Sequence, residues 1–174
     1  MDQKTLKLQI KSLDEAGKFS GLASVYGNVD LGGDVVVQGA FQKTLADRGG
    51  EVPILFVHDI RQPVGLGKLR DTAQGLSIEG ALVLDVPKAR EAYSLLKAKV
   101  LRGLSIGYDT IKSDVQNGVR YLRELKLFEV SLVVMPMNER ATITAVKNNR
   151  PELAEQIKQF QALLSECKRQ FWES

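Results

Sequence analysis

Apolar and polar residues alternate along most of the chain, which predicts a protein built mainly from β-strands. Residues 5–12 alternate, with leucines and an isoleucine on one side and polar residues on the other. This pattern is typical of a strand with one solvated face. Further strands are expected at 19–26, 52–57, 64–69, 76–84, 104–111, 119–125, 127–134 and 142–146. An Asn-Gly pair at 117–118 predicts a tight hairpin turn.

Helices are expected in three places. A short helix at 41–47 is closed by two glycines, and Pro87 opens a second helix that runs to about Val100. From Pro151 onward, apolar residues recur in steps of four and three, which predicts a long amphipathic helix. Its polar face mixes Glu with Lys, so we expect it to pack on the barrel or on a second subunit, since membrane-surface helices are usually strongly cationic.

These elements predict one mostly β domain with some α-helix. We expect a closed antiparallel β-barrel of about seven strands with helices around it. Residues 1–148 would form the barrel, and residues 149–174 would form the C-terminal amphipathic helix of the same domain.

Composition narrows the function classes. The chain has 174 residues, a net charge of +3 and 6% aromatic residues. Its Lys and Arg are scattered among Asp and Glu, so we expect no specific nucleic-acid binding. A single Cys and a single His exclude an internal disulfide and any metal site made only of these residues. We expect no cofactor. No apolar stretch has the length of a signal peptide or of a membrane span, which predicts a cytoplasmic protein.

Two residues are candidates for nucleophilic chemistry. His58, the only histidine, follows the apolar run at 52–57, and any His-dependent mechanism must use it. Ser105 lies in Gly-Leu-Ser-Ile-Gly, which fits the G-x-S-x-G pattern, in which the glycines are expected to allow a sharp turn. Ser77 stands in a near copy of this motif that lacks the second glycine. An ordinary structural role stays open for all three residues.

Chain order separates the possible hydrolase folds. In α/β-hydrolases the histidine follows the serine, whereas here His58 precedes Ser105. A chymotrypsin-like order would need an Asp between them. Asp71 and Asp85 lie there, but the chain is short for a double barrel. Glu129 lies inside an apolar strand, where a carboxylate is costly unless it is paired. An imidazole would satisfy it, although Glu129 facing solvent is the alternative.

The sequence resembles the prohead protease family of tailed phages over about residues 19–146. The family is similar in fold to the herpesvirus assemblins. The segments that carry the resemblance are GLASVYGNVD at 21–30, GDVV at 33–36, GAF at 39–41, VHD at 57–59, PVG at 63–65, AY at 92–93, LLK at 95–97, GLSIGY at 103–108 and EVSLV at 129–133.

The resemblance implies a serine endopeptidase with Ser105 as nucleophile, His58 as general base and Glu129 as third member. Glu139, in the loop that follows the strand of Glu129, is a second candidate for the third member of this catalytic triad. Candidate oxyanion donors are the backbone N–H groups of Met137 or Asn138, or the side chain of Arg140.

The resemblance further implies that the substrates are the scaffolding segment of the major capsid protein and the protease itself. We expect a homodimer that acts in the bacterial host cytoplasm inside the assembling prohead, with no membrane partner. The C-terminal helix is then expected to be an interface or a capsid-targeting element. A non-catalytic capsid scaffolding protein is the main alternative, and a basic nucleic-acid-associated barrel is another. The sequence gives no cleavage specificity, and it leaves open whether the chain is a precursor or a trimmed product.

Overall fold

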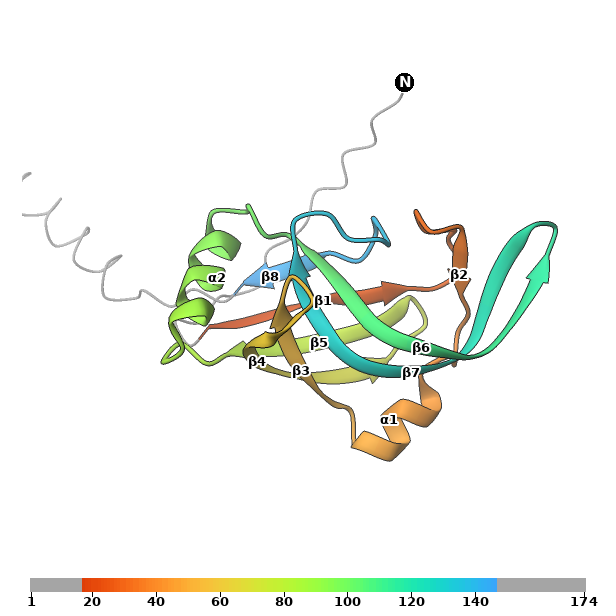
Figure 1. The fold of residues 1–174 in the computed structure, drawn as a ribbon, viewed down its shortest axis with the longest axis horizontal. Coiled ribbons are helices and arrows are strands. Elements are labelled where there is room, and N and C mark those ends of the chain that lie inside the picture. Colours follow the sequence, from red (N-terminus) through yellow and green to blue (C-terminus); the bar gives the residue numbers. More distant parts are fainter. Residues whose placement is uncertain (1–16, 147–174) are drawn as a thin grey trace, which may run out of the picture.

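The computed structural model describes residues 17–146 of the chain (Figure 1). The expected strand at 5–12, the expected C-terminal helix and the boundary at 148/149 lie outside the described residues. In chain order the elements are β1 (Lys18–Val25), β2 (Asp34–Val36), α1 (Gln42–Arg48), β3 (Glu51–Phe56), β4 (Asp59–Asp71), β5 (Gly75–Leu82), α2 (Pro87–Lys97), β6 (Gly103–Gln116), β7 (Val119–Val133) and β8 (Ile143–Val146).

Strand β7 organises the sheet because it pairs with three other strands. Strand β6 runs antiparallel along its whole length. On its other edge β7 pairs in parallel with β2 near Tyr121 and with β3 near Ser131. From β3 the sheet continues through β4, β5, β1 and β8 in antiparallel pairs. The prediction of a purely antiparallel sheet is therefore wrong at two ladders. Both join strands distant in the chain, whose relative direction local patterning does not determine.

The sheet curls around one core (Figure 1). Its two ends approach where β6 begins: Leu104 N donates to Ala141 O at 3.0 Å, and Ile143 N donates to Arg102 O at 3.0 Å. Beyond this contact no ladder joins β6 to β8 among residues 17–146. The described structure is thus a curled sheet and not the continuous closed barrel expected, because β8 has only four residues and its ladder runs along β1.

Most of the expected local elements are confirmed. Asn117 and Gly118 have φ angles of 51° and 79°, as a two-residue hairpin turn requires. The two strands expected at 119–125 and 127–134 are one strand, β7, whose ladder with β6 contains bulges. Strand β2 was missed because it has three residues next to a loop rich in Gly and Asp.

The two helices close the core from different sides (Figure 1). Helix α2 buries the expected stripe, namely Ala89, Ala92, Tyr93 and Leu96. Helix α1 is fastened to β7 by Thr44, whose hydroxyl donates to Leu125 O at 2.8 Å and accepts from Leu127 N at 3.1 Å. Neither helix has the length and apolar content that crossing a bilayer requires, and no other helix among residues 17–146 does.

The approach of β1 to the 141–143 segment generates a prediction. A Cβ at Gly21 would overlap Thr142 O and would also press on the side chain of Leu104. We expect Gly21→Ala to lower the free energy of unfolding by about 1–3 kcal/mol, because the clash is with backbone. Urea unfolding measures this. Gly32→Ala is the control, since its Cβ would lie 3.2 Å from Asp30 Oδ1 and would meet no backbone atom within 4 Å. An equal loss in both variants would contradict the account.

Candidate active site

One face of the β6–β7 pair carries the candidate residues. Ser105 stands directly opposite Ser131, and Gly107 stands opposite Glu129. Opposed residues in a ladder share a face, and residues two apart along a strand share it too. All four residues therefore lie on the same side of the sheet. The residues between them point to the core: Leu104, Val130 and Leu132, with Ile106 partly buried.

A strained hairpin turn places His58 on this face. Phe56 pairs with Asp59, so Val57 and His58 form a two-residue turn between β3 and β4. Their φ angles are 51° and 58°, both in the left-handed region that such a turn requires. Asn-Gly is the usual choice there, and a β-branched residue with positive φ is a genuine outlier. Strain of this kind persists only where surrounding contacts impose it.

Two hydrogen bonds hold the turn against β7. Val57 N donates to Leu132 O at 3.2 Å, and His58 N donates to the Ser131 hydroxyl at 2.9 Å. Consequently, the histidine backbone is fixed to the strand that also carries Glu129. The imidazole is then directed at a carboxylate whose location is set by the same strand.

Glu129 is buried and doubly paired. Its Oε1 lies 2.6 Å from His58 Nδ1, and its Oε2 accepts from the Ser131 hydroxyl at 2.7 Å. The Glu129 side chain is 11% exposed and the His58 side chain 44% exposed. Opposite an ionised carboxylate, which only accepts hydrogen bonds, Nδ1 is the donor and Nε2 is the ring nitrogen that can act as a base. The sequence-based expectation of a buried Glu129 paired with an imidazole matches this geometry.

The glycines of the serine motif make room for other groups. A Cβ at Gly107 would overlap the Glu129 carboxylate, and a Cβ at Gly103 would lie 2.6 Å from Pro136 Cδ. Neither glycine has a positive φ, and Ser105 lies in the extended strand β6. The sharp turn that this motif forms in nucleophile elbows is therefore absent here, and the strand expected at 104–111 is confirmed. The motif therefore shares only its spacing with a nucleophile elbow. Gly107 leaves space for the Glu129 carboxylate, and Gly103 leaves space for Pro136 in the loop that follows β7.

Ser105 is partly buried, and its hydroxyl makes no hydrogen bond with any other residue in the range 17–146. Its neighbours on this face are Gly103 and Gly107, which have no side chains to cover it. Ser77, the near copy, donates to Arg70 O at 3.1 Å and lies on β5, opposite the end of β4 farthest from His58. The structure thus brings Ser105, and not Ser77, to the face that holds His58.

Asp59 follows His58 directly but serves the turn. Its carboxylate accepts from the Arg61 side chain at 3.0 Å and from the Gln62 amide at 2.8 Å. The hydrogen bond from Arg61, followed by that from Gln62, holds the pKa of Asp59 well below its usual range. The Asp59 carboxylate is therefore ionised and is bound to Arg61 and Gln62, whereas Glu129 is the carboxylate that contacts the imidazole.

The candidate oxyanion residues lie in the loop after β7, which approaches β6 where Pro136 meets Gly103, two residues before Ser105. Met137 O accepts from Leu31 N at 3.1 Å. The Asn138 amide donates to Val25 O at 3.2 Å, and its oxygen accepts from Arg140 N at 3.1 Å. The loop is thus anchored to β1 and to the 28–33 loop. Glu139 and Arg140 are exposed, and neither side chain contacts His58.

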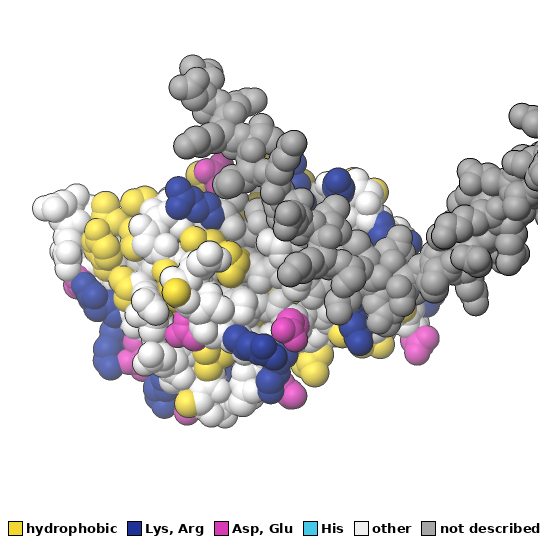
Figure 2. Space-filling model, turned by 180° about the vertical axis from the view of Figure 1, so that it is seen from behind, with side chains coloured by type: hydrophobic (Ala, Val, Ile, Leu, Met, Phe, Trp, Pro, Cys, Tyr) yellow, Lys and Arg dark blue, Asp and Glu magenta, His cyan; other side chains and the backbone are white. Residues whose placement is uncertain are grey.

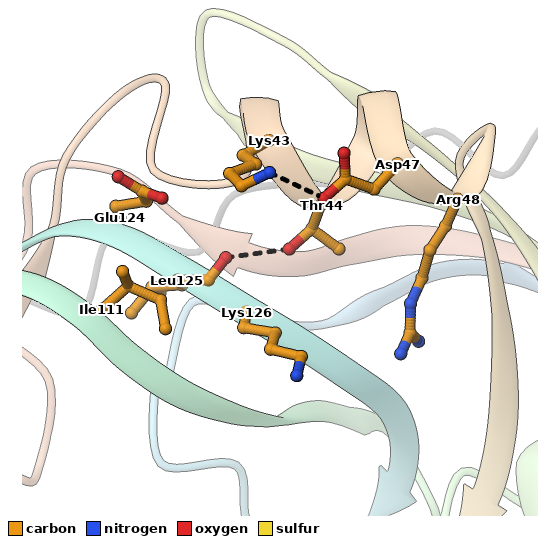
Figure 3. A pocket seen from close by; sticks show the side chains of 8 residues that line it. All are labelled: Lys43, Thr44, Asp47, Arg48, Ile111, Glu124, Leu125 and Lys126. Carbon is orange, nitrogen blue, oxygen red and sulfur yellow. Dashed lines mark hydrogen bonds and ion pairs between the residues drawn. The ribbon is translucent and has the colours of Figure 1, made fainter.

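A pocket of about 500 Å³ lies elsewhere, between α1 and the middle of β6 and β7 (Figure 3). Its charged groups are largely paired, for example Lys43 with Asp47 at 3.0 Å. None of His58, Ser105 and Glu129 lines it. The pocket and the candidate active site are therefore separate parts of the molecule.

Ser131 is the site residue that the sequence did not reveal. It is fully buried and touches both members of the His58–Glu129 pair. The available signal was its spacing, because Ser131 lies two residues after Glu129 and shares its face in a strand. A small polar residue in an apolar strand beside a buried carboxylate is a natural partner for it.

Comparisons with known proteins identify the family to which this sequence is similar. A family model described as Caudovirus prohead serine protease matches residues 4–156. The chain is 31% identical over 137 residues to the prohead protease of Enterobacteria phage HK97, covering 76% of this chain and 61% of that protein. It is also 31% identical over 173 residues to the prohead protease of Escherichia phage T5, covering 93% of this chain and 81% of that protein. The match thus spans less than two thirds of the HK97 protein.

Two further comparisons are more distant. The chain is 31% identical over 151 residues to the capsid polyprotein of Pseudomonas phage PAJU2, covering 81% of this chain and 22% of that protein. Among solved structures, it is similar to KSHV protease in complex with a hexapeptide phosphonate inhibitor. The TM-score is 0.48 at 17% identity, with coverage of 72% of this chain and 62% of that chain. No residue role follows from a structural likeness of this level.

The close approach of the Glu129 carboxylate to Gly107 generates a prediction about the His58–Glu129 hydrogen bond, which can be tested without an activity assay. We expect Gly107→Ala to push the carboxylate off His58 Nδ1, because the added methyl and Oε1 would occupy the same space. Since the chain has one histidine, its ring NMR signals come from His58 alone. The variant should lose the downfield Nδ1 proton signal of a carboxylate-bound imidazole. Ser113→Ala, an exposed change on the same strand, should keep it, and an unchanged signal in Gly107→Ala would refute the steric account.

Proposed function

This chain belongs to the Caudovirus prohead serine protease family, and on that premise we propose that it is a serine endopeptidase that matures phage heads. One observation carries the proposal: His58 Nδ1 lies 2.6 Å from the buried carboxylate of Glu129, on the face of β6–β7 that displays Ser105. The residues are a hydroxyl, an imidazole and a carboxylate, which together perform acyl transfer in serine proteases of several folds.

In the proposed mechanism, Ser105 Oγ attacks the carbonyl carbon of the scissile peptide bond while His58 Nε2 removes its proton. The resulting imidazolium is stabilised by Glu129, which accepts from Nδ1. Collapse of the tetrahedral intermediate expels the amine, which receives the proton from His58. Water then attacks the acyl-enzyme by the same route, releasing the second product and restoring the Ser105 hydroxyl.

We propose the loop after β7 as the source of oxyanion stabilisation. It lies beside Ser105 through the Pro136–Gly103 contact, and its shape is held by Asn138. The backbone N–H groups of Met137 and Asn138 donate to no acceptor within residues 17–146, so they are available to a substrate oxygen. Arg140 adds an exposed cation in the same loop. A donor of this kind is typically worth about 2.7–4 kcal/mol in the transition state.

The proposed substrates are the scaffolding segment of the major capsid protein and the protease itself, within the assembling prohead in the bacterial cytoplasm. Relatives named prohead protease and capsid polyprotein support this choice. A relative from Lactococcus phage c2 is named major capsid protein, and it is 27% identical over 139 residues. The expected dimer and the interface role of the C-terminal helix stay predictions.

Two alternatives make different predictions. A non-catalytic scaffolding protein has no need of a strained turn that aims its only histidine at a buried carboxylate. A nucleic-acid-associated barrel predicts a surface of one charge sign. On the face shown in Figure 2, Lys and Arg side chains lie interspersed with Asp and Glu. This arrangement favours a mixed solvated surface on that face over a groove for a polyanion.

The proposed activity predicts cleavage that depends on both Ser105 and His58. The chain is co-expressed with the major capsid protein of its own head-gene cluster, beside Ser105→Ala and His58→Ala variants. We expect discrete capsid-protein fragments with the wild type and none with either variant, because nucleophile and base are each indispensable. Intact mass of both proteins is the measurement.

Two results would contradict this assignment. Cleavage that survives Ser105→Ala would exclude Ser105 as the nucleophile and direct attention to Ser77. Absence of cleavage in the wild type, even after the portal and other head components are added, would favour the scaffolding alternative.

The choice of Glu129 over Glu139 as third member generates a separate prediction. We expect Glu129→Gln to slow cleavage by about 10²- to 10⁴-fold, because an amide can fix the wrong tautomer of His58. Glu139→Gln is the matched control and should leave the rate unchanged, since Glu139 is exposed and makes no contact with His58. Time courses of capsid-protein cleavage measure both, and the reverse ranking would assign the role to Glu139.

A further inference from the structure

We infer that Ser131 is a positioning residue of this site, which holds His58 and Glu129 in register with Ser105. The inference deepens the proposed function and rests on it for the link to catalysis. Ser131 is 0% exposed and cannot meet a substrate. Its hydroxyl joins the two other residues: it accepts from His58 N at 2.9 Å and donates to Glu129 Oε2 at 2.7 Å.

The bond to Glu129 fixes the rotation of the carboxylate. Glu129 and Ser131 are two residues apart on β7, so their side chains stand side by side on one face. With Oε2 held by Ser131, Oε1 is directed at His58 Nδ1. Without the Ser131 hydroxyl, Oε2 would be a buried charged oxygen with no donor among the described residues, which is costly. The carboxylate would then rotate or draw in water, and Oε1 would leave the imidazole.

The bond from His58 N fixes the turn. Val57 and His58 both hold left-handed φ angles, which cost free energy and need compensating contacts. Each of their backbone N–H groups has one partner on β7, the Leu132 carbonyl for Val57 and the Ser131 hydroxyl for His58. Only the second is a side chain, so it is the one contact of this pair that a substitution can remove.

The register connects both bonds to the nucleophile. Ser131 stands directly across the ladder from Ser105, at a Cβ separation that is typically about 4.5–5.5 Å. A hydroxyl that fixes the base and its carboxylate at this point therefore fixes them relative to Ser105. Reacting groups displaced by about 1 Å can lose on the order of 10²-fold in rate. Ser131 thus determines the alignment of the triad without touching substrate.

The test compares three substitutions in the full chain. Ser131→Ala removes the hydroxyl and adds no volume, whereas Ser131→Thr keeps a hydroxyl at this strand position. Thr44→Val is the matched control, because Thr44 is also a buried hydroxyl with two hydrogen bonds to one strand, there Leu125 O and Leu127 N of β7. Urea unfolding establishes that each variant folds.

The first readout is the second-order rate of labelling by a fluorophosphonate. We expect Ser131→Ala to slow labelling by about 10- to 100-fold, Ser131→Thr to restore most of the rate, and Thr44→Val to leave it unchanged. The control separates a positioning role from a loss of stability, since Thr44→Val loses an equivalent hydroxyl outside the site.

The second readout does not depend on activity. Selective ¹⁵N-histidine labelling gives a single backbone amide signal, because His58 is the only histidine. In the wild type this amide should be protected from hydrogen exchange by Ser131, and in Ser131→Ala it should exchange about five- to tenfold faster. Loss of the downfield Nδ1 proton signal should accompany the change.

The two readouts keep the outcomes distinct. Wild-type protein that resists the fluorophosphonate would count against the proposed function, while the amide exchange would still decide the role of Ser131 in holding the turn. If Ser131→Ala is labelled at the wild-type rate and keeps both His58 signals, the inference is overturned. A slowing shared equally by Thr44→Val would also overturn it, since the effect would then be one of stability.

Discussion

The buried carboxylate of Glu129 is the constraint on which the rest of the site depends. A carboxylate removed from water must be compensated by charge or hydrogen bonds. Here the compensation comes from His58 and Ser131, which bind the two carboxylate oxygens. Gly107, on the neighbouring strand, has no side chain and so leaves space for the carboxylate. Because Glu129 lies on β7, which pairs with β3 and β6 at the same level, its partners come from both neighbours. One buried group therefore assembles residues that are distant in the chain.

The same arrangement places local strain at the site of the proposed chemistry. The left-handed turn at Val57 and His58 is unfavourable for these residue types, and two hydrogen bonds to β7 maintain it. The position of His58 is fixed at two points, because its backbone N–H is bound by Ser131 and its ring by Glu129. Ser105 needs no such device, because it lies in a regular strand whose register is set by its whole ladder with β7.

Much of the site could be predicted from the sequence, and what could not is physically identifiable. The count of one histidine made His58 a candidate base, and the cost of a carboxylate in an apolar strand made Glu129 a candidate partner. Their roles in a triad were implied by the family resemblance. Ser105 was selected by a motif whose glycines have another purpose, since Gly107 admits the carboxylate and forms no turn. The role of Ser131 depends on cross-strand register, and the parallel pairing of β3 with β7 is a long-range contact. The alternation of residues within a strand predicted most of the strands, but it carries no information on cross-strand register or on which distant strands pair.

The most direct test of the central claim is to identify the residue that a serine-directed reagent modifies. The purified chain is treated with a fluorophosphonate, and the adduct is located by peptide mass spectrometry. The account predicts one adduct, on Ser105, that disappears when His58 is replaced by alanine. An adduct on another serine, or labelling of Ser105 that does not need His58, would contradict the claim that this face of the β6–β7 pair is the active site.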